Sequence, residues 1–292
     1  MGLMEQCTRR GRLLRAGIFL IGLAALPDAA ESARSNGAET PVVSLAFDDA
    51  GGVLWKATSR SIAQSINDGR TWRPVRLPAS MQGNITSLTI SSGTAKSIYV
   101  ATRGSGVSRS LNGGRTWVAS NQGLPAGEVI ALAAHSTRPR TVYAYVAGIG
   151  IFRSTNAGAT WQFFNRGPDA HLVQLAHSNM SSEVGRGWLF AATRRGVRRA
   201  MDCFCKWQNA GRVSVGFITV ATDSAWPDRI YAGARDGFFI SPDGGAHWVR
   251  MRSPVAPVTA LASTLSGKLY GAINGKVIRS ANRGVTWEYI AE

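Results

Sequence analysis

The chain has 292 residues, of which 45% are hydrophobic, with 33 glycines and nine tryptophans. This composition excludes a disordered chain and is sufficient for one large core or two modest ones. The 33 basic residues outnumber 17 acids, which gives a formal charge of +16. Such a charge favours acidic partners, while an arginine-rich composition also produces ordinary solvated loop arginines.

The first 33 residues predict an export signal peptide. Four arginines between positions 9 and 15 precede an apolar run over 16–26, and small residues follow Pro27. The run is too short to span a bilayer. We therefore expect a linker over 34–41 and an exported protein that is periplasmic or secreted, or lumenal in a photosynthetic cell. The sequence leaves the general and twin-arginine export routes open.

An octapeptide of the form Ser-x-Asn/Asp-x-Gly-x-Thr-Trp recurs along the rest of the chain. Its clear copies begin at Ser65, Ser110, Ser154, Ser241 and Ser280. A degenerate copy, AMDCFCKW, begins at Ala200. The six closing tryptophans are 45, 44, 46, 41 and 39 residues apart. This regular period is typical of a repeat architecture.

Each repeat predicts four strands, which we letter A to D in chain order. Strands A and B are apolar runs such as ITSLTI and SIYVATR, and strand C is a shorter run such as GVSRS. The octapeptide follows as a turn, and its Thr-Trp end begins strand D. We expect six blades, at about 42–77, 85–120, 129–165, 172–210, 217–252 and 258–292. The fold class is an all-β, six-bladed β-propeller; a seventh blade would need a strand from 34–41.

Within the octapeptide, three positions have structural roles. The third-position side chain accepts hydrogen bonds from its own turn, the fifth-position glycine takes a positive φ, and the tryptophan is buried. The third-position residues are Asn67, Asn112, Asn156, Asp202, Asp243 and Asn282. The tryptophans are Trp72, Trp117, Trp161, Trp207, Trp248 and Trp287.

This pattern resembles the Asp-box, also called the BNR repeat, and the resemblance covers nearly all of the chain after residue 41. Asp-box propellers include sialidases, xyloglucanase-type glycoside hydrolases, sortilin-like receptors and the photosystem II stability/assembly factor family. The chain is most similar to the last group in size, short connections and basic character. That group implies an exported, non-catalytic propeller that holds a membrane-protein precursor through an arginine-rich face, although its members often have seven blades.

The expected binding residues lie in the B–C loops, away from the octapeptides. Five of the six B–C loops carry a cation, and together with the D–A connections they are expected to form one face. The residues are Arg60, Arg103, Arg194, Arg195, Arg235 and Lys276. Arginine suits carboxylates, so we expect an acidic or membrane-protein partner, or an anionic glycan. Export argues against nucleic acid, and we expect a monomer.

A glycoside hydrolase or a glycan-binding propeller is the alternative function. Hydrolysis normally needs two facing carboxyl groups, whereas the acids here are few and many belong to the octapeptides. We therefore expect no catalytic residues, no cofactor and no metal site. Cys203 and Cys205 are expected to form a local disulfide or to remain free thiols, because a metal site would need further ligands.

Overall fold

The computed structural model describes residues 40–81, 83–93, 97–168, 171–182, 185, 187–201, 206–213 and 215–290. The predicted signal peptide, most of the linker, Asp202, Cys203 and Cys205 therefore lie outside the described residues.

Six four-stranded antiparallel sheets make up the fold, and in each sheet the strands follow chain order. The first blade contains β1 (Val42–Asp48), β2 (Val53–Thr58), β3 (Ile62–Ser65) and β4 (Arg73–Val75). The second contains β5 (Ile85–Ile90), β6 (Ile98–Thr102), β7 (Gly106–Ser110) and β8 (Val118–Ala119). The third contains β9 (Val129–Ala134), β10 (Val142–Val146), β11 (Gly150–Ser154) and β12 (Gln162–Asn165).

The second half of the chain repeats this arrangement. The fourth blade contains β13 (Leu172–Ser178), β14 (Trp188–Thr193), β15 (Gly196–Met201) and β16 (Gln208–Asn209). The fifth contains β17 (Phe217–Thr222), β18 (Ile230–Ala234), β19 (Gly237–Ser241) and β20 (Val249–Arg250). The sixth contains β21 (Ala260–Ser263), β22 (Leu269–Ile273), β23 (Lys276–Ser280) and β24 (Glu288–Tyr289).

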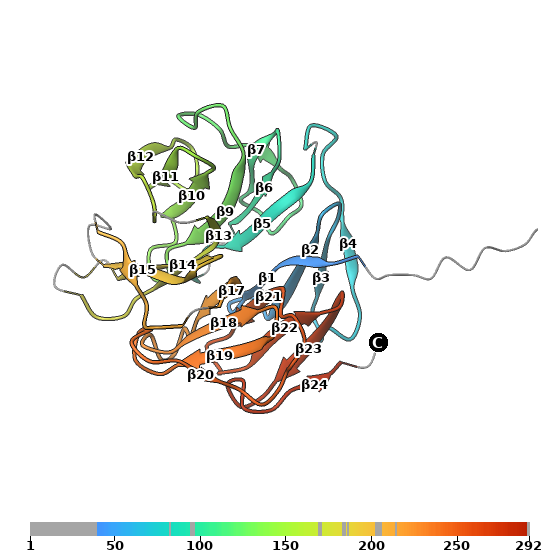
Figure 1. Cartoon of the computed structure of the whole chain (residues 1–292). Coiled ribbons are helices and arrows are strands. Elements are labelled where there is room, and N and C mark those ends of the chain that lie inside the picture. The colour runs from blue at the N-terminus through green and yellow to red at the C-terminus, as the bar shows by residue number, and fades with distance from the viewer. Residues whose placement is uncertain are drawn as a thin grey trace, which may run out of the picture. The chain divides into compact units, whose positions relative to one another are not determined.

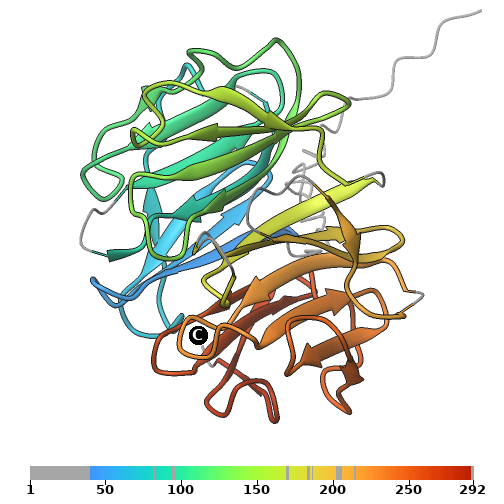
Figure 2. The same cartoon turned by 90° about the vertical axis from the view of Figure 1, so that its left-hand side faces the viewer.

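The blades are arranged in a closed ring around the first strand of each sheet. Each A strand lies next to the A strand of the following blade, and β21 lies next to β1, so the ring closes (Figure 1). Figure 2 shows the same ring turned by 90°. The B strands of the second to sixth blades are almost wholly buried, as in β6, while short D strands such as β8 are exposed at the rim. The predicted six-bladed propeller is confirmed.

Blade-to-blade packing supplies the core, because a single sheet cannot cover both of its own faces. Each hydrophobic cluster joins two neighbouring blades; Tyr99 of β6, for example, packs with Val129 and Leu132 of β9. The central edges of the A strands are also satisfied across blades. Ser44 Oγ donates to Leu88 O at 3.0 Å and accepts from Leu88 N at 3.2 Å. The polar positions of the A strands therefore replace the hydrogen bonds that a further strand would make.

The ring closes through side chains, since the first and last blades each consist of four consecutive strands. Asp68, in the first octapeptide turn, accepts hydrogen bonds from Lys268 Nζ at 2.9 Å and Arg279 at 3.1 Å, and also from the Tyr270 hydroxyl. Thr259 Oγ1 donates to Val42 O at 2.8 Å. We call this contact between the first and sixth blades the seam. It combines these hydrogen bonds with the apolar cluster that the two blades share.

The propeller has two faces, and each is formed by different loops. On the first, which we call the B–C face, B–C loops contact D–A connections; Arg103 N, for example, donates to Asn84 O at 2.9 Å. On the second, the A–B face, A–B loops contact octapeptide turns, as where Ala157 N donates to Arg140 O at 2.8 Å. Within the described ranges there is no helix long and apolar enough to cross a membrane.

Candidate functional site

The octapeptide turns satisfy their own polar groups. In the first copy, Ser65 Oγ accepts from Gly69 N at 2.8 Å, and Asn67 Oδ1 accepts from Thr71 N at 2.9 Å. Asn67 Nδ2 donates to Thr71 Oγ1 at 3.0 Å. The second, third and sixth blades repeat this network. These side chains hold the turn and have little capacity left for a ligand.

The same turns also bind neighbouring blades together, which the repeat pattern did not predict. The fifth-position glycines have φ between 76° and 89°, and a Cβ on any of them would meet the preceding blade. At Gly284, for example, it would lie 2.6 Å from Phe238. The indole of Trp161 donates to Ser120 O of the preceding blade at 2.7 Å, and that of Trp248 donates to Ala210 O at 2.9 Å.

Arginines in the C strands form a second link between blades. Arg109 donates to the carbonyl of Ala157, and Arg199 donates to that of Gly244. Both acceptors are fourth-position residues in the octapeptide of the following blade. Arg279 reaches the equivalent residue, Asp68, across the seam. Part of the basic charge of the chain is therefore structural. The one sequence signal is the recurring Arg-Ser that ends several C strands.

The predicted binding residues all lie on the B–C face with exposed side chains. They are Arg60, Arg103, Arg194, Arg195, Arg235 and Lys276. Arg103 pairs with Glu128 at 3.0 Å. Arg194 and Arg195 line an open cavity of about 560 Å³ together with Arg212, so blade 4 brings three arginines together. Arg60, Arg235 and Lys276 project from three other blades.

Acidic side chains are concentrated on the other face. Of the nine described acids, six lie at the end of β1, in A–B loops or in octapeptide turns: Asp48, Asp49, Asp68, Asp223, Asp228 and Asp243. The B–C face holds two, Glu128 and Asp236, and each lies beside an arginine. Within the described residues, the acids are therefore divided unevenly between the two faces.

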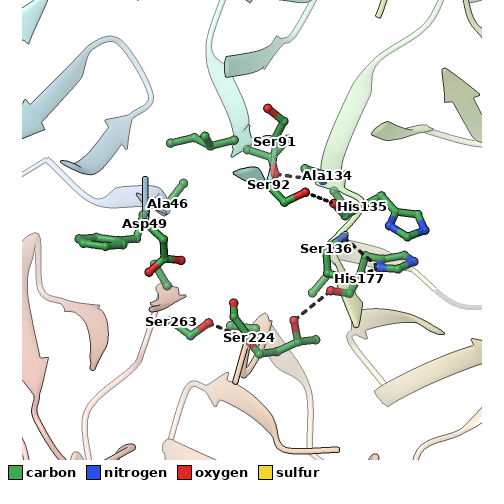
Figure 3. A pocket seen from close by; sticks show the side chains of 18 of the residues that line it. Ala46, Asp49, Ser91, Ser92, Ala134, His135, Ser136, His177, Ser224 and Ser263 are labelled. Carbon is green, nitrogen blue, oxygen red and sulfur yellow. Dashed lines mark hydrogen bonds between the residues drawn. The ribbon is translucent and has the colours of Figure 1, made fainter. Parts of the chain in front are cut away.

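The axis of the propeller holds a second cavity, which opens on the A–B face and has a volume of about 470 Å³. The carboxyl ends of all six A strands and the loops that follow them line it (Figure 3). We call it the axial pocket. Sequence reasoning missed it because each wall residue comes from a different blade, and only ring closure brings these residues together.

Two stacked histidines form one wall of the axial pocket. The rings of His135 and His177 are 3.8 Å apart and both side chains are buried. His177 Nδ1 accepts from Ser136 N at 3.2 Å, and His135 Nδ1 accepts from Thr137 N at 3.2 Å. A backbone N–H can only donate, so Nδ1 of each ring acts as a hydrogen-bond acceptor.

Asp49 points into the axial pocket from the β1–β2 connection (Figure 3). Its Oδ1 accepts from Leu265 N at 2.8 Å, across the seam between blades 1 and 6. Loss of water around the carboxyl group raises the pKa of Asp49, the Leu265 N–H opposes that rise, and the adjacent Asp48 charge adds to it. Among the described residues, no three of the types His, Cys, Asp and Glu gather into a metal-binding group.

No protein-family model matches the sequence, and no curated protein matches it. The fold is similar to that of several solved propellers. YCF48 from Cyanidioschyzon merolae has a TM-score of 0.60 at 15% identity, over 87% of each chain. A structure described as YCF48 bound to D1 peptide has a TM-score of 0.55 at 16% identity, over 86% of this chain and 78% of that one.

A GH74 xyloglucanase from Xanthomonas campestris is also similar, with a TM-score of 0.62 at 16% identity. This chain is covered over 86% of its length but spans only 47% of the enzyme. At these identities the similarity shows a shared β-propeller fold. The class of protein is thus a six-bladed β-propeller, and the β-propellers similar to it include a structure described with a bound peptide and a glycoside hydrolase.

Proposed function

We propose that this protein is an exported, non-catalytic scaffold that binds an acidic segment of another protein through the B–C face. The distribution of charge carries the proposal. Among the described residues, Arg60, Arg194, Arg195 and Arg235 form no ion pair, while both acids of that face lie beside other arginines. The B–C face therefore presents positive charge that its own acids do not neutralise.

Arg194, Arg195 and Arg212 form the best-defined part of this surface. They converge on one cavity at the side of blade 4, and their side chains are exposed. A guanidinium group binds a carboxylate through two parallel hydrogen bonds, so three such groups suit a segment with several carboxylates. The similarity to a propeller whose structure is described with a bound D1 peptide supports a protein ligand. An assembly or stability role would follow if that ligand is a membrane-protein precursor.

Glycoside hydrolysis is the second candidate, and the similarity to a GH74 xyloglucanase favours it. That chemistry normally uses two carboxyl groups on opposite sides of the scissile bond. The carboxylates at the axial pocket, Asp48 and Asp49, are adjacent residues at the end of β1, and those on the B–C face lie beside arginines. This arrangement supports binding better than hydrolysis. Release of reducing sugar from xyloglucan by the purified protein would favour the second candidate.

The test is the binding of fluorescein-labelled decaglutamate, measured by fluorescence anisotropy, to wild type and two charge-reversed triple variants. One variant carries Arg194→Glu, Arg195→Glu and Arg235→Glu on the B–C face. Its matched control carries Arg70→Glu, Arg115→Glu and Arg140→Glu, three exposed arginines of the A–B face. We expect the first variant to bind at least about tenfold more weakly, and the control to remain within about twofold of wild type.

Equal weakening by both variants would mean that net charge, and not the B–C face, governs binding. In a pull-down from the exporting cell, wild type and the A–B face control should recover a natural partner, and the B–C face variant should recover less of it. A partner retained equally by both variants would contradict the proposal.

A further inference from the structure

Eight hydroxyl side chains line the described part of the axial pocket, and four of them give their protons to other groups of the protein. Ser92 Oγ donates to His135 O at 3.2 Å, and Thr222 Oγ1 donates to His177 O at 3.0 Å. Ser263 Oγ donates to Thr222 O at 2.6 Å. These bonds run from blade to blade around the rim of the pocket (Figure 3).

Ser136 completes the pattern. Its backbone N–H donates to His177 Nδ1, so that nitrogen is an acceptor, and the Ser136 hydroxyl at 3.0 Å must donate to it as well. Each of the four hydroxyl oxygens therefore keeps only lone pairs for a ligand. These four oxygens can accept hydrogen bonds from a ligand that is rich in donors.

The charge of the pocket points in the same direction. Its described lining contains two carboxylates, Asp48 and Asp49, and neither lysine nor arginine, in a chain of net charge +16. Other acids of the A–B face have cationic partners: Asp68 binds Lys268 and Arg279, and Asp223 lies 3.4 Å from Arg283. Asp49 forms no ion pair among the described residues, and its one hydrogen bond, from Leu265 N, holds the carboxylate in place.

We propose that the axial pocket binds a small organic cation with a primary ammonium group, with Asp49 as its counter-ion. An ammonium group has three donors and no acceptor, which matches the carboxylate and the four hydroxyl oxygens. Phe47 and the aliphatic residues of the A strands line the deeper wall and suit a short carbon chain. This site lies on the face opposite to the arginines of the proposed function, so each proposal can fail without the other.

The experiment is isothermal titration of the full chain at low ionic strength with 1,4-diaminobutane, and separately with 1,4-butanediol, which has the same carbon chain without charge. We expect saturable binding of one diamine per chain and no measurable binding of the diol. Asp49→Asn should weaken diamine binding at least about tenfold. Asp228→Asn is the matched control, because Asp228 is an exposed acid of the same face outside the pocket, and it should stay within about twofold of wild type.

A second variant guards against a folding defect in Asp49→Asn. Ser224 lies exposed at the mouth of the pocket, so Ser224→Phe should obstruct entry while the circular dichroism spectrum and Tm remain those of wild type. Equal binding of diol and diamine, undiminished binding by both variants, or the absence of saturable diamine binding would overturn the proposal. Binding of Ca²⁺ in place of the diamine would also overturn it and would assign the pocket to a metal ion.

Discussion

The two faces of the propeller are built from the same repeat, yet they differ in how their side chains are used. On the A–B face, the octapeptide turns, the C-strand arginines and Asp68 link each blade to a neighbour. On the B–C face, the contacts between loops are mostly backbone hydrogen bonds, and the long cationic side chains remain exposed. We therefore expect changes in the octapeptide turns and C-strand arginines to alter stability, and changes in the B–C loops to alter binding of the acidic partner.

The largest expected effect is from a methyl group at a blade junction. Gly284→Ala places Cβ 2.6 Å from the buried ring of Phe238 and forces alanine to φ +85°. We expect a loss of about 2–4 kcal/mol in the free energy of unfolding, measured by urea denaturation. Gly104→Ala, in a B–C loop at φ +92° with no atom nearby, should cost only about 1 kcal/mol. If both substitutions lowered the free energy of unfolding equally, the positive φ, and not the contact with Phe238, would account for the loss.

The seam between the first and last blades comes next. Asp68→Ala removes the acceptor of Lys268, Tyr270 and Arg279, and should lower the free energy of unfolding by about 1–3 kcal/mol because those groups stay partly buried. Asp68→Asn keeps an acceptor and tolerates the positive φ of 60°, so it should cost less. If alanine and asparagine cost the same, the charge and not the hydrogen bonds holds the seam.

Asp243 makes the stability of the folded protein depend on pH. Burial would raise the pKa of this group, but hydrogen bonds from the His247 N–H, the His247 imidazole and Ser241 outweigh burial and lower it to about 2. The folded pKa is below the unfolded value of about 3.9, so the carboxylate stabilises the protein above that value and the effect is lost as the pH falls toward 2.

Asp243→Asn tests this dependence cleanly, because four other octapeptides already have asparagine there. The difference in free energy of unfolding between wild type and variant should be larger at pH 5 than at lower pH, and should be lost as the pH falls through about 2. Chemical denaturation across that pH series would measure it. A difference that does not change with pH would contradict the role of the carboxylate.

The smallest expected effect is on the B–C face. Arg60→Ala and Arg235→Ala remove exposed side chains without described partners, so each should change the free energy of unfolding by less than about 0.5 kcal/mol. Thermal unfolding of both variants beside wild type would measure this. A loss above 1 kcal/mol would show that these arginines support the fold and would weaken the contrast between the faces.

The repeat predicted much of this molecule because the relevant information is local. The tryptophan spacing gave the number of blades, and the octapeptide chemistry of Asn67 and Gly69 needs only its own turn. Their second role was not predictable: Gly69 also adjoins Ile290, 221 positions away, and Trp161 bonds to the preceding blade. The arginines of the C strands look like surface charge in the sequence, and only the neighbouring carbonyls show their use.

By itself, the sequence determined six blades, the order of strands within each, and a strongly basic chain. Those properties depend on periodicity and composition, which can be read directly from the linear sequence. Tertiary structure decided which acids meet which arginines, how Asp68 joins the two ends of the ring, and that six A strands enclose an axial pocket with Asp49 at its mouth. Closure of a ring brings together residues that no local pattern relates, because each blade contributes only one part of the wall.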